Sequence, residues 1–125
     1  MSEILIVEDN PRLSRLMQLN LEAEGYQVTL HSDGIQASDY LRAHSPDLVI
    51  LDLMLLTLSG WEILEQLRRD PRLDRTPIVI ISAMARPEDR QRALSMGASE
   101  YFLKPFVVRD LLTSVNRLLQ DVSHA

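Results

Sequence analysis

The sequence contains no cysteine, which excludes disulfide bonds, thiolate catalysis and cysteine-ligated metals. No apolar run approaches the roughly 20 residues that a transmembrane helix needs, so the sequence predicts no membrane span. The first apolar run is flanked by the acidic residues Glu3, Glu8 and Asp9, which does not fit the pattern of a signal peptide. We therefore expect a cytoplasmic protein.

Lysine is almost absent, because Lys104 is the only lysine among the 13 basic residues and all the others are arginine. A compact ammonium is not interchangeable with a planar guanidinium, so this single position calls for a chemical explanation. The formal net charge of -5 argues against a general grip on nucleic acid, since such a grip needs many cations along the phosphate backbone. An acidic chain instead suits a site for a hard cation.

Three short runs of the chain are almost entirely aliphatic, which is typical of strands buried on both faces of a parallel sheet. A fourth segment alternates polar and apolar residues, and a fifth places two aromatic residues before a leucine. The five predicted strands are residues 4–7, 26–30, 47–52, 78–81 and 100–103.

Helical stripes of apolar residues follow each predicted strand. Asn10 and Ser59 are start signals for two of these helices, and Gly25 and Gly97 are stop signals for two. Five strands that alternate with five helices predict an α/β fold, in which one parallel sheet carries helices on both faces. A chain of this length fits one core, so we expect residues 1–125 to form a single domain.

Polar side chains stand at the carboxyl ends of four predicted strands. Glu8 and Asp9 follow the first strand, Asp52 ends the third, Ser82 follows the fourth and Lys104 follows the fifth. Because parallel strands end at one edge of the sheet, these groups should converge. Three close carboxylates repel one another unless a cation is bound, and a ligand set made only of oxygen favours Mg²⁺. A carboxylate, a metal, a lysine and a hydroxyl can together move a phosphoryl group, with Asp52 as the nucleophile.

The order and spacing of these residues resemble the receiver domain of two-component response regulators over essentially the whole chain. The matching segments are Glu8-Asp9, Asp52-Leu53-Met54-Leu55, Gly60, Ser82-Ala83, Gly97-Ala98, Tyr101 and Lys104-Pro105-Phe106. The resemblance implies a flavodoxin-like (βα)5 doubly wound parallel sheet with strand order 2-1-3-4-5, similar to that of chemotaxis regulators. It also implies a phosphorylated switch rather than an enzyme, with only self-phosphorylation and dephosphorylation chemistry.

The same resemblance implies a role for each site residue. Asp52 would accept a phosphoryl group from a phosphohistidine. Asp9, Asp52 and the backbone carbonyl of Met54 would ligate Mg²⁺, with Glu8 acting through a water molecule. The groups that would hold the phosphoryl oxygens are the Lys104 ammonium, the Ser82 hydroxyl and the Ala83 backbone N–H. The bond between Lys104 and Pro105 would be cis, which the small trans preference of an X–Pro bond permits.

The resemblance further implies how the signal leaves the domain. Ser82 would move toward the phosphoryl group and Tyr101 would swing inward, which would repack the face formed by the fourth helix, the fifth strand and the fifth helix. The implied partners are a sensor histidine kinase or a histidine phosphotransfer protein, and a downstream output protein or domain; no direct contact with nucleic acid or membrane is expected. The residues implied to dock the phosphodonor are Asn10, Leu13, Leu16, Pro105 and Phe106.

Two other functions are compatible with parts of this pattern. A Mg²⁺-dependent phosphatase with an Asp nucleophile would share the acidic site, but enzymes similar to haloacid dehalogenases usually carry a second acid where this chain has Met54. A flavin-binding protein of flavodoxin-like fold is less compatible, because Glu8 and Asp9 would repel the flavin phosphate. The apolar loop Leu53–Leu58 also permits two interpretations, since it could pack on Trp61 or form a docking surface.

Overall fold

A computed structural model describes residues 1–123, with side chains described for residues 1–120. Five parallel strands form one sheet in the order β2-β1-β3-β4-β5, which confirms the predicted strand order. The strands are β1 (Glu3–Val7), β2 (Gln27–His31), β3 (Leu48–Asp52), β4 (Ile78–Ser82) and β5 (Glu100–Leu103). Every residue of β3 and β4 is buried, as expected for central strands covered on both faces.

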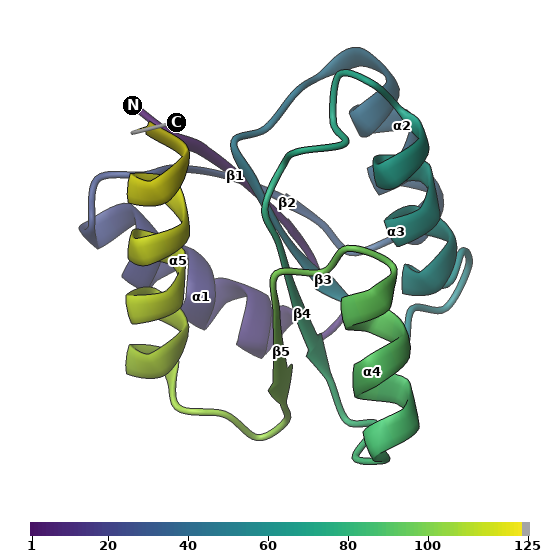
Figure 1. Cartoon of the computed structure of the whole chain (residues 1–125). Coiled ribbons are helices and arrows are strands. Elements are labelled where there is room, and N and C mark those ends of the chain that lie inside the picture. Colours follow the sequence, from purple (N-terminus) through teal and green to yellow (C-terminus); the bar gives the residue numbers. More distant parts are fainter. Residues whose placement is uncertain (124–125) are drawn as a thin grey trace.

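Helices cover both faces of this sheet (Figure 1). Since neighbouring residues of a strand point to opposite faces, each strand contributes to two cores. One core lies between the sheet and helices α1 and α5, and the other between the sheet and helices α2, α3 and α4. The helices are α1 (Pro11–Ala23), α2 (Gly34–Ala43), α3 (Gly60–Arg69), α4 (Pro87–Ser95) and α5 (Val108–Ser123). None of them, within residues 1–123, is long and apolar enough to cross a bilayer.

The second strand differs from its prediction by one residue. The alternating pattern predicted residues 26–30, whereas the strand comprises Gln27–His31. The register of this strand is set by its pairing with β1, in which Glu3 lies opposite Gln27 and Val7 lies opposite His31. Tyr26 precedes the strand and packs partly against the core under α1 and α5. The shift places His31 beside the acidic edge, where its carbonyl accepts a hydrogen bond from the Glu8 N–H (3.2 Å).

The apolar loop after β3 divides its side chains between the core and the surface, and its predicted role as a docking surface stays a prediction. Leu55 and Leu58, together with Trp61, pack against the core under α2, α3 and α4. Met54 and Leu56 instead project outward, with 56% and 89% of their surface exposed. Trp61 also carries the guanidinium of Arg92 over its ring, 4.1 Å from the ring centroid.

Gly60 is a position where the start of α3 packs tightly against the end of β3 and the residue after it. A Cβ atom there would lie 2.3 Å from the carbonyl oxygen of Asp52 and 2.5 Å from the Cα of Leu53. Both neighbours are backbone atoms that cannot rotate away, so we expect Gly60→Ala to lower the free energy of unfolding by about 3 kcal/mol. Urea denaturation measures this loss. Gly25→Ala is the control, because Gly25 has a positive φ but open space around it, and we expect a loss of only about 1 kcal/mol.

Candidate functional site

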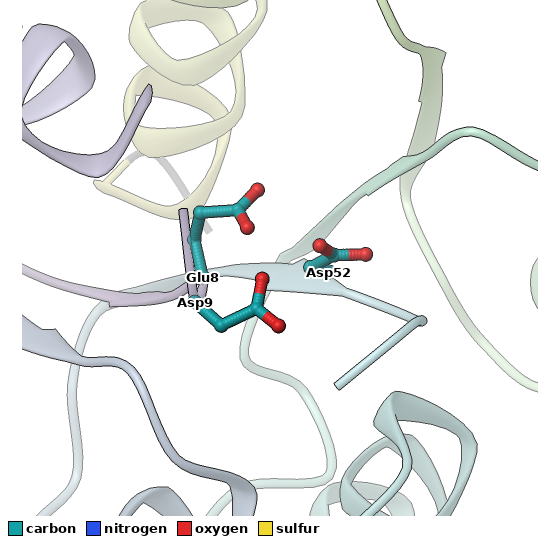
Figure 2. A group of neighbouring side chains, drawn as sticks. All are labelled: Glu8, Asp9 and Asp52. Atoms are coloured by element: carbon teal, nitrogen blue, oxygen red, sulfur yellow. The ribbon is translucent and has the colours of Figure 1, made fainter. Parts of the chain in front are cut away.

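Three carboxylates gather at the carboxyl edge of the sheet (Figure 2). Glu8 and Asp9 follow β1 directly, and Asp52 is the last residue of the neighbouring strand β3. One oxygen from each of these side chains lies within 4.8 Å of the other two. Glu8 and Asp52 are almost fully buried, whereas Asp9 is partly exposed. The side chains that the sequence predicted to converge therefore do converge.

Lys104 completes this acidic edge from the other side of the sheet. Its ammonium lies 2.6 Å from Oε1 of Glu8 and 2.8 Å from Oδ2 of Asp52. The side chain is 23% exposed, so one cation reaches between two nearly buried anions while keeping access to solvent. The one lysine of the chain is thus the counter-charge of the carboxylate cluster.

Burial and mutual repulsion change the ionisation of this cluster. Burial raises the pKa of Glu8 from its ordinary value of 4.5 to about 7, against the lowering effect of its hydrogen bonds with Lys104 and the Asn10 N–H. The negative charge of Asp52 adds to the rise. Burial alone would lower the pKa of Lys104, but hydrogen bonds to Asp52 and Glu8 outweigh it, so its pKa is raised. Three carboxylates thus share one ammonium, and this excess of acidic groups favours the binding of a further cation.

Backbone groups hold the two buried carboxylates in place. Oδ1 of Asp52 accepts a hydrogen bond from the Met54 N–H (2.9 Å), and Oε2 of Glu8 accepts one from the Asn10 N–H (3.0 Å). Ser82, at the end of β4, is fully buried, and its hydroxyl oxygen accepts a hydrogen bond from the Met84 N–H (3.0 Å). The side-chain oxygens of this edge are therefore oriented by the loops that follow the strands.

The predicted switch residues lie next to this edge. Tyr101 of β5 is half-buried, packs against the core under α2, α3 and α4, and donates its hydroxyl hydrogen to the carbonyl of Met84 (2.8 Å). Its ring is therefore already turned toward the sheet rather than toward solvent.

Ala83 is exposed in the loop between β4 and α4. The bond between Lys104 and Pro105 is cis.

A groove of about 320 Å³ opens beside Lys104, between α1 and the loop that connects β5 to α5. Four of the five predicted docking residues line it, but Asn10 does not: its side chain accepts hydrogen bonds from the N–H groups of Arg12 and Leu13 and caps α1. Sequence reasoning missed Val108, which also lines the groove. An apolar residue at the very start of a helix gives no signal of its own. The lining residues are Leu13, Leu16, Lys104, Pro105, Phe106 and Val108.

The chain belongs to the response regulator receiver domain family, whose model matches residues 4–116. This assignment agrees with the fold and with the acidic edge, and it defines a phosphoacceptor signalling module of two-component systems. It gives no support to the alternative of a Mg²⁺-dependent phosphatase.

Curated relatives of known role are similar over nearly the whole chain. The DNA-binding dual master transcriptional regulator RpaA of Synechocystis is 38% identical over 120 residues, which cover 96% of this chain and 50% of the relative. The phosphate regulon transcriptional regulatory protein PhoB of Rhizobium meliloti is 40% identical over 118 residues, which cover 94% of this chain and 52% of the relative. The chain thus spans about half the length of these relatives.

Solved receiver domains have the same fold. The signal receiver domain of a histidine kinase from Syntrophus aciditrophicus is 32% identical, with a TM-score of 0.91, and covers 100% of this chain and 95% of its own. The receiver domain of a sensor histidine kinase from Pseudomonas aeruginosa is 34% identical, with a TM-score of 0.85, and covers 95% of this chain and 98% of its own. The second of these structures contains a magnesium ion coordinated in its active-site cleft.

Proposed function

We propose that Asp52 is the phosphoacceptor of this receiver domain. The observation that carries this proposal is the position of its carboxylate at the end of the central strand, 2.8 Å from the Lys104 ammonium and within 4.8 Å of the Glu8 and Asp9 carboxylates. Glu8 is the one other carboxylate of residues 1–120 that combines burial, a lysine partner and two acidic neighbours. Burial raises the pKa of Glu8 to about 7, which makes it the poorer nucleophile near neutral pH, whereas Asp52 stands at the end of the central strand.

The proposed reaction transfers one phosphoryl group between two side chains. A carboxylate oxygen of Asp52 attacks the phosphorus of a phosphohistidine, a new O–P bond forms, and the P–N bond breaks. The electron pair of that bond stays on the leaving imidazole, which picks up a proton from solvent. Lys104, the Ser82 hydroxyl and the Ala83 N–H would then hold the transferred oxygens. The domain changes only its own state, so it acts as a switch and not as an enzyme that turns over a substrate.

The oxygen donors at this edge fit a hard divalent cation, and we propose Mg²⁺ as the cofactor. Asp9, Asp52 and the backbone carbonyl of Met54 would ligate it, with Glu8 acting through water. Bound there, it would neutralise charge that develops on the phosphoryl oxygens. Asp9 is the carboxylate of the three that is partly open to solvent, and it offers the entry side of the site.

The proposed partners follow from this chemistry. A phosphohistidine on a sensor histidine kinase or a histidine phosphotransfer protein supplies the phosphoryl group, and the groove beside Lys104 receives that donor. Phosphorylation adds roughly -1.5 to -2 charges next to Ser82 and Lys104. Movement of Ser82 would then change the contacts of Tyr101, whose ring already faces inward, and with them the face formed by α4, β5 and α5, to which an output protein or domain binds. Residues 1–125 act as one cytoplasmic domain that does not itself contact nucleic acid.

Labelling with acetyl phosphate tests the proposal without any partner protein. We expect one phosphoryl group to appear on the intact protein in the presence of Mg²⁺, and peptide mapping to place it on Asp52. Excess chelator should prevent the labelling, because Lys104 alone does not neutralise three carboxylates and the remaining negative charge would repel the phosphodonor. A phosphoryl group mapped to another residue would contradict the assignment.

A further inference from the structure

The loop between β3 and α3 forms few hydrogen bonds of its own. The N–H groups of residues 55–59 form no backbone hydrogen bond within residues 1–123, the part of the chain that the structure describes. Leu55 and Leu58 pack partly against the core, whereas the side chains of Met54 and Leu56 are exposed. The backbone carbonyl of Met54, a proposed metal ligand, therefore lies on a segment whose position depends on a small number of contacts.

One side-chain hydrogen bond ties the middle of this loop to the turn before α2. The Thr57 hydroxyl donates to Oδ1 of Asp33 (2.7 Å), and among the described residues it is the one hydrogen bond that residues 55–58 form. The acceptor is itself held in place, because Asp33 is the N-cap of α2. The same oxygen accepts hydrogen bonds from the N–H groups of Ile35 (2.7 Å) and Gln36 (3.4 Å). The loop is thus attached to the fixed end of a helix.

A close packing contact lies beside this hydrogen bond. Gly34 is buried at the first position of α2, and a Cβ atom there would lie 2.2 Å from the carbonyl oxygen of Leu58 and 2.8 Å from its Cβ. Two neighbouring residues of the turn therefore meet two neighbouring residues of the loop, one pair through a hydrogen bond and the other through packing. We call Asp33, Gly34, Thr57 and Leu58 the α2 anchor of the loop.

The hydrogen bond of the α2 anchor serves the loop more than the helix. Two N–H groups already bind the Asp33 carboxylate, so α2 would be capped without the Thr57 hydroxyl. The acceptor is also charged at neutral pH, because the hydrogen bond from Thr57 lowers the pKa of Asp33. A hydroxyl that donates to a carboxylate forms a stronger bond than one that donates to a neutral oxygen.

We propose that Thr57 and Asp33 are positioning residues, whose hydrogen bond fixes the loop and thereby holds the Met54 carbonyl in place as a ligand of Mg²⁺. This inference rests on the proposed function, because it takes Met54 as a ligand. Mg²⁺ demands a nearly ideal octahedral geometry, so a mobile loop would have to be ordered when the ion binds, which lowers the affinity. Groups that orient a ligand without touching the metal change the affinity by about 10- to 100-fold. Thr57 stands three residues from the ligand, so we expect a smaller effect of about fivefold.

Replacement of the Thr57 hydroxyl by a methyl group tests this role. Thr57→Val keeps the branched shape of the side chain and removes the donor. Titration of Mg²⁺ into the ¹⁵N-labelled protein gives the dissociation constant, which we expect to rise about fivefold. In the metal-free protein, the backbone order parameters of residues 55–58 should fall clearly below the value of about 0.85 that is typical of a rigid backbone. Thr57→Ser keeps the donor and should retain both the affinity and the order parameters of the unmodified chain.

Two comparisons separate positioning of the loop from a general loss of stability. Thr113→Val makes the same exchange on α5, where the hydroxyl donates to the Arg109 carbonyl (3.0 Å), and it should leave the Mg²⁺ affinity unchanged. Asp33→Ala removes the acceptor and should weaken Mg²⁺ binding at least as much as Thr57→Val does. Adding Thr57→Val to Asp33→Ala should then cause no further loss, because the two residues act through one hydrogen bond.

Several outcomes would overturn the inference: an unchanged Mg²⁺ affinity or unchanged order parameters in Thr57→Val, an equal loss of affinity in Thr113→Val or Thr57→Ser, or a further loss in the double variant. Failure of the proposed function gives a different result, since the wild-type protein itself would then not bind Mg²⁺ or not be labelled by acetyl phosphate, and both ideas would be rejected. A wild-type protein that binds Mg²⁺ and is labelled, together with equal Mg²⁺ binding by Thr57→Val, refutes only the role of the α2 anchor.

Discussion

Asp52→Asn is expected to reduce labelling by acetyl phosphate by at least about hundredfold, to the limit of detection. The amide nitrogen and oxygen of Asn keep the shape of the side chain, but the amide is a far weaker nucleophile than a carboxylate. The Met54 N–H retains an oxygen acceptor in the variant, so the loop after β3 should keep its position. Phosphate-affinity electrophoresis and intact mass measure the loss directly.

Asp39→Asn is the matched control for this substitution. Asp39 lies on α2, is exposed and pairs with Arg42 on the surface, so the same chemical change occurs far from the acidic edge. We expect labelling of this variant to equal that of the unmodified protein. Undiminished labelling of the Asp52→Asn variant would move the acceptor to another carboxylate, with Asp9 as the nearest exposed alternative.

The fold was predictable because strands and helices differ in the spacing of their apolar residues. The aliphatic runs in β1, β3 and β4 predicted strands that are buried on both faces. The apolar stripes of the helices between them predicted the side chains that cover the two faces of the sheet. The convergence of Glu8, Asp52 and Lys104 then follows from parallel topology alone, since all three stand at carboxyl strand ends. The site was therefore predictable as a set of residues.

The details that depend on tertiary contacts could not be predicted in the same way. The register of β2 is set by its pairing with β1, and its own half-buried pattern is too weak to fix the first residue. The simultaneous ion pairs of Lys104 with Glu8 and Asp52 depend on the path of the loop after β5. The cap that Asn10 forms on α1 was predicted from the sequence, whereas its absence from the lining of the groove depends on how α1 packs beside the loop after β5.

The second large effect concerns stability, which we expect to fall as the pH rises from about 4.5 to about 7 in the metal-free protein. The cause is Glu8, whose pKa is raised from 4.5 to about 7 by burial. In this interval the folded protein binds a proton that the unfolded chain releases, so folding is favoured at the acidic end. Above pH 7 both states have lost that proton, and the stabilisation is gone.

The expected size of this loss is on the order of 3 kcal/mol, since each unit of pKa difference corresponds to about 1.4 kcal/mol. Other side chains whose pKa is shifted change the stability in other pH intervals. The pKa of Asp33 is lowered by its hydrogen bond with Thr57, and that of Asp70 by its hydrogen bond with the Arg72 N–H, so the stability that they contribute is present throughout this interval and is lost only as the pH falls below it. The raised pKa of Lys104 acts only in strongly basic solution. Urea denaturation between pH 5 and pH 8 in the presence of chelator therefore isolates Glu8.

Glu8→Gln should remove this pH dependence and make the metal-free protein more stable at pH 8 than the unmodified chain. The amide oxygen of Gln can still accept the Asn10 N–H, and Lys104 keeps its ion pair with Asp52. Glu22→Gln, at an exposed position of α1, is the control and should leave the pH profile unchanged. Equal pH profiles for Glu8→Gln and the unmodified protein would show that the buried carboxylate is not the source of the effect. If the Glu8→Gln variant instead has a higher free energy of unfolding, then the buried carboxylate lowers the stability of the fold, and a function in binding a cation explains why it is there.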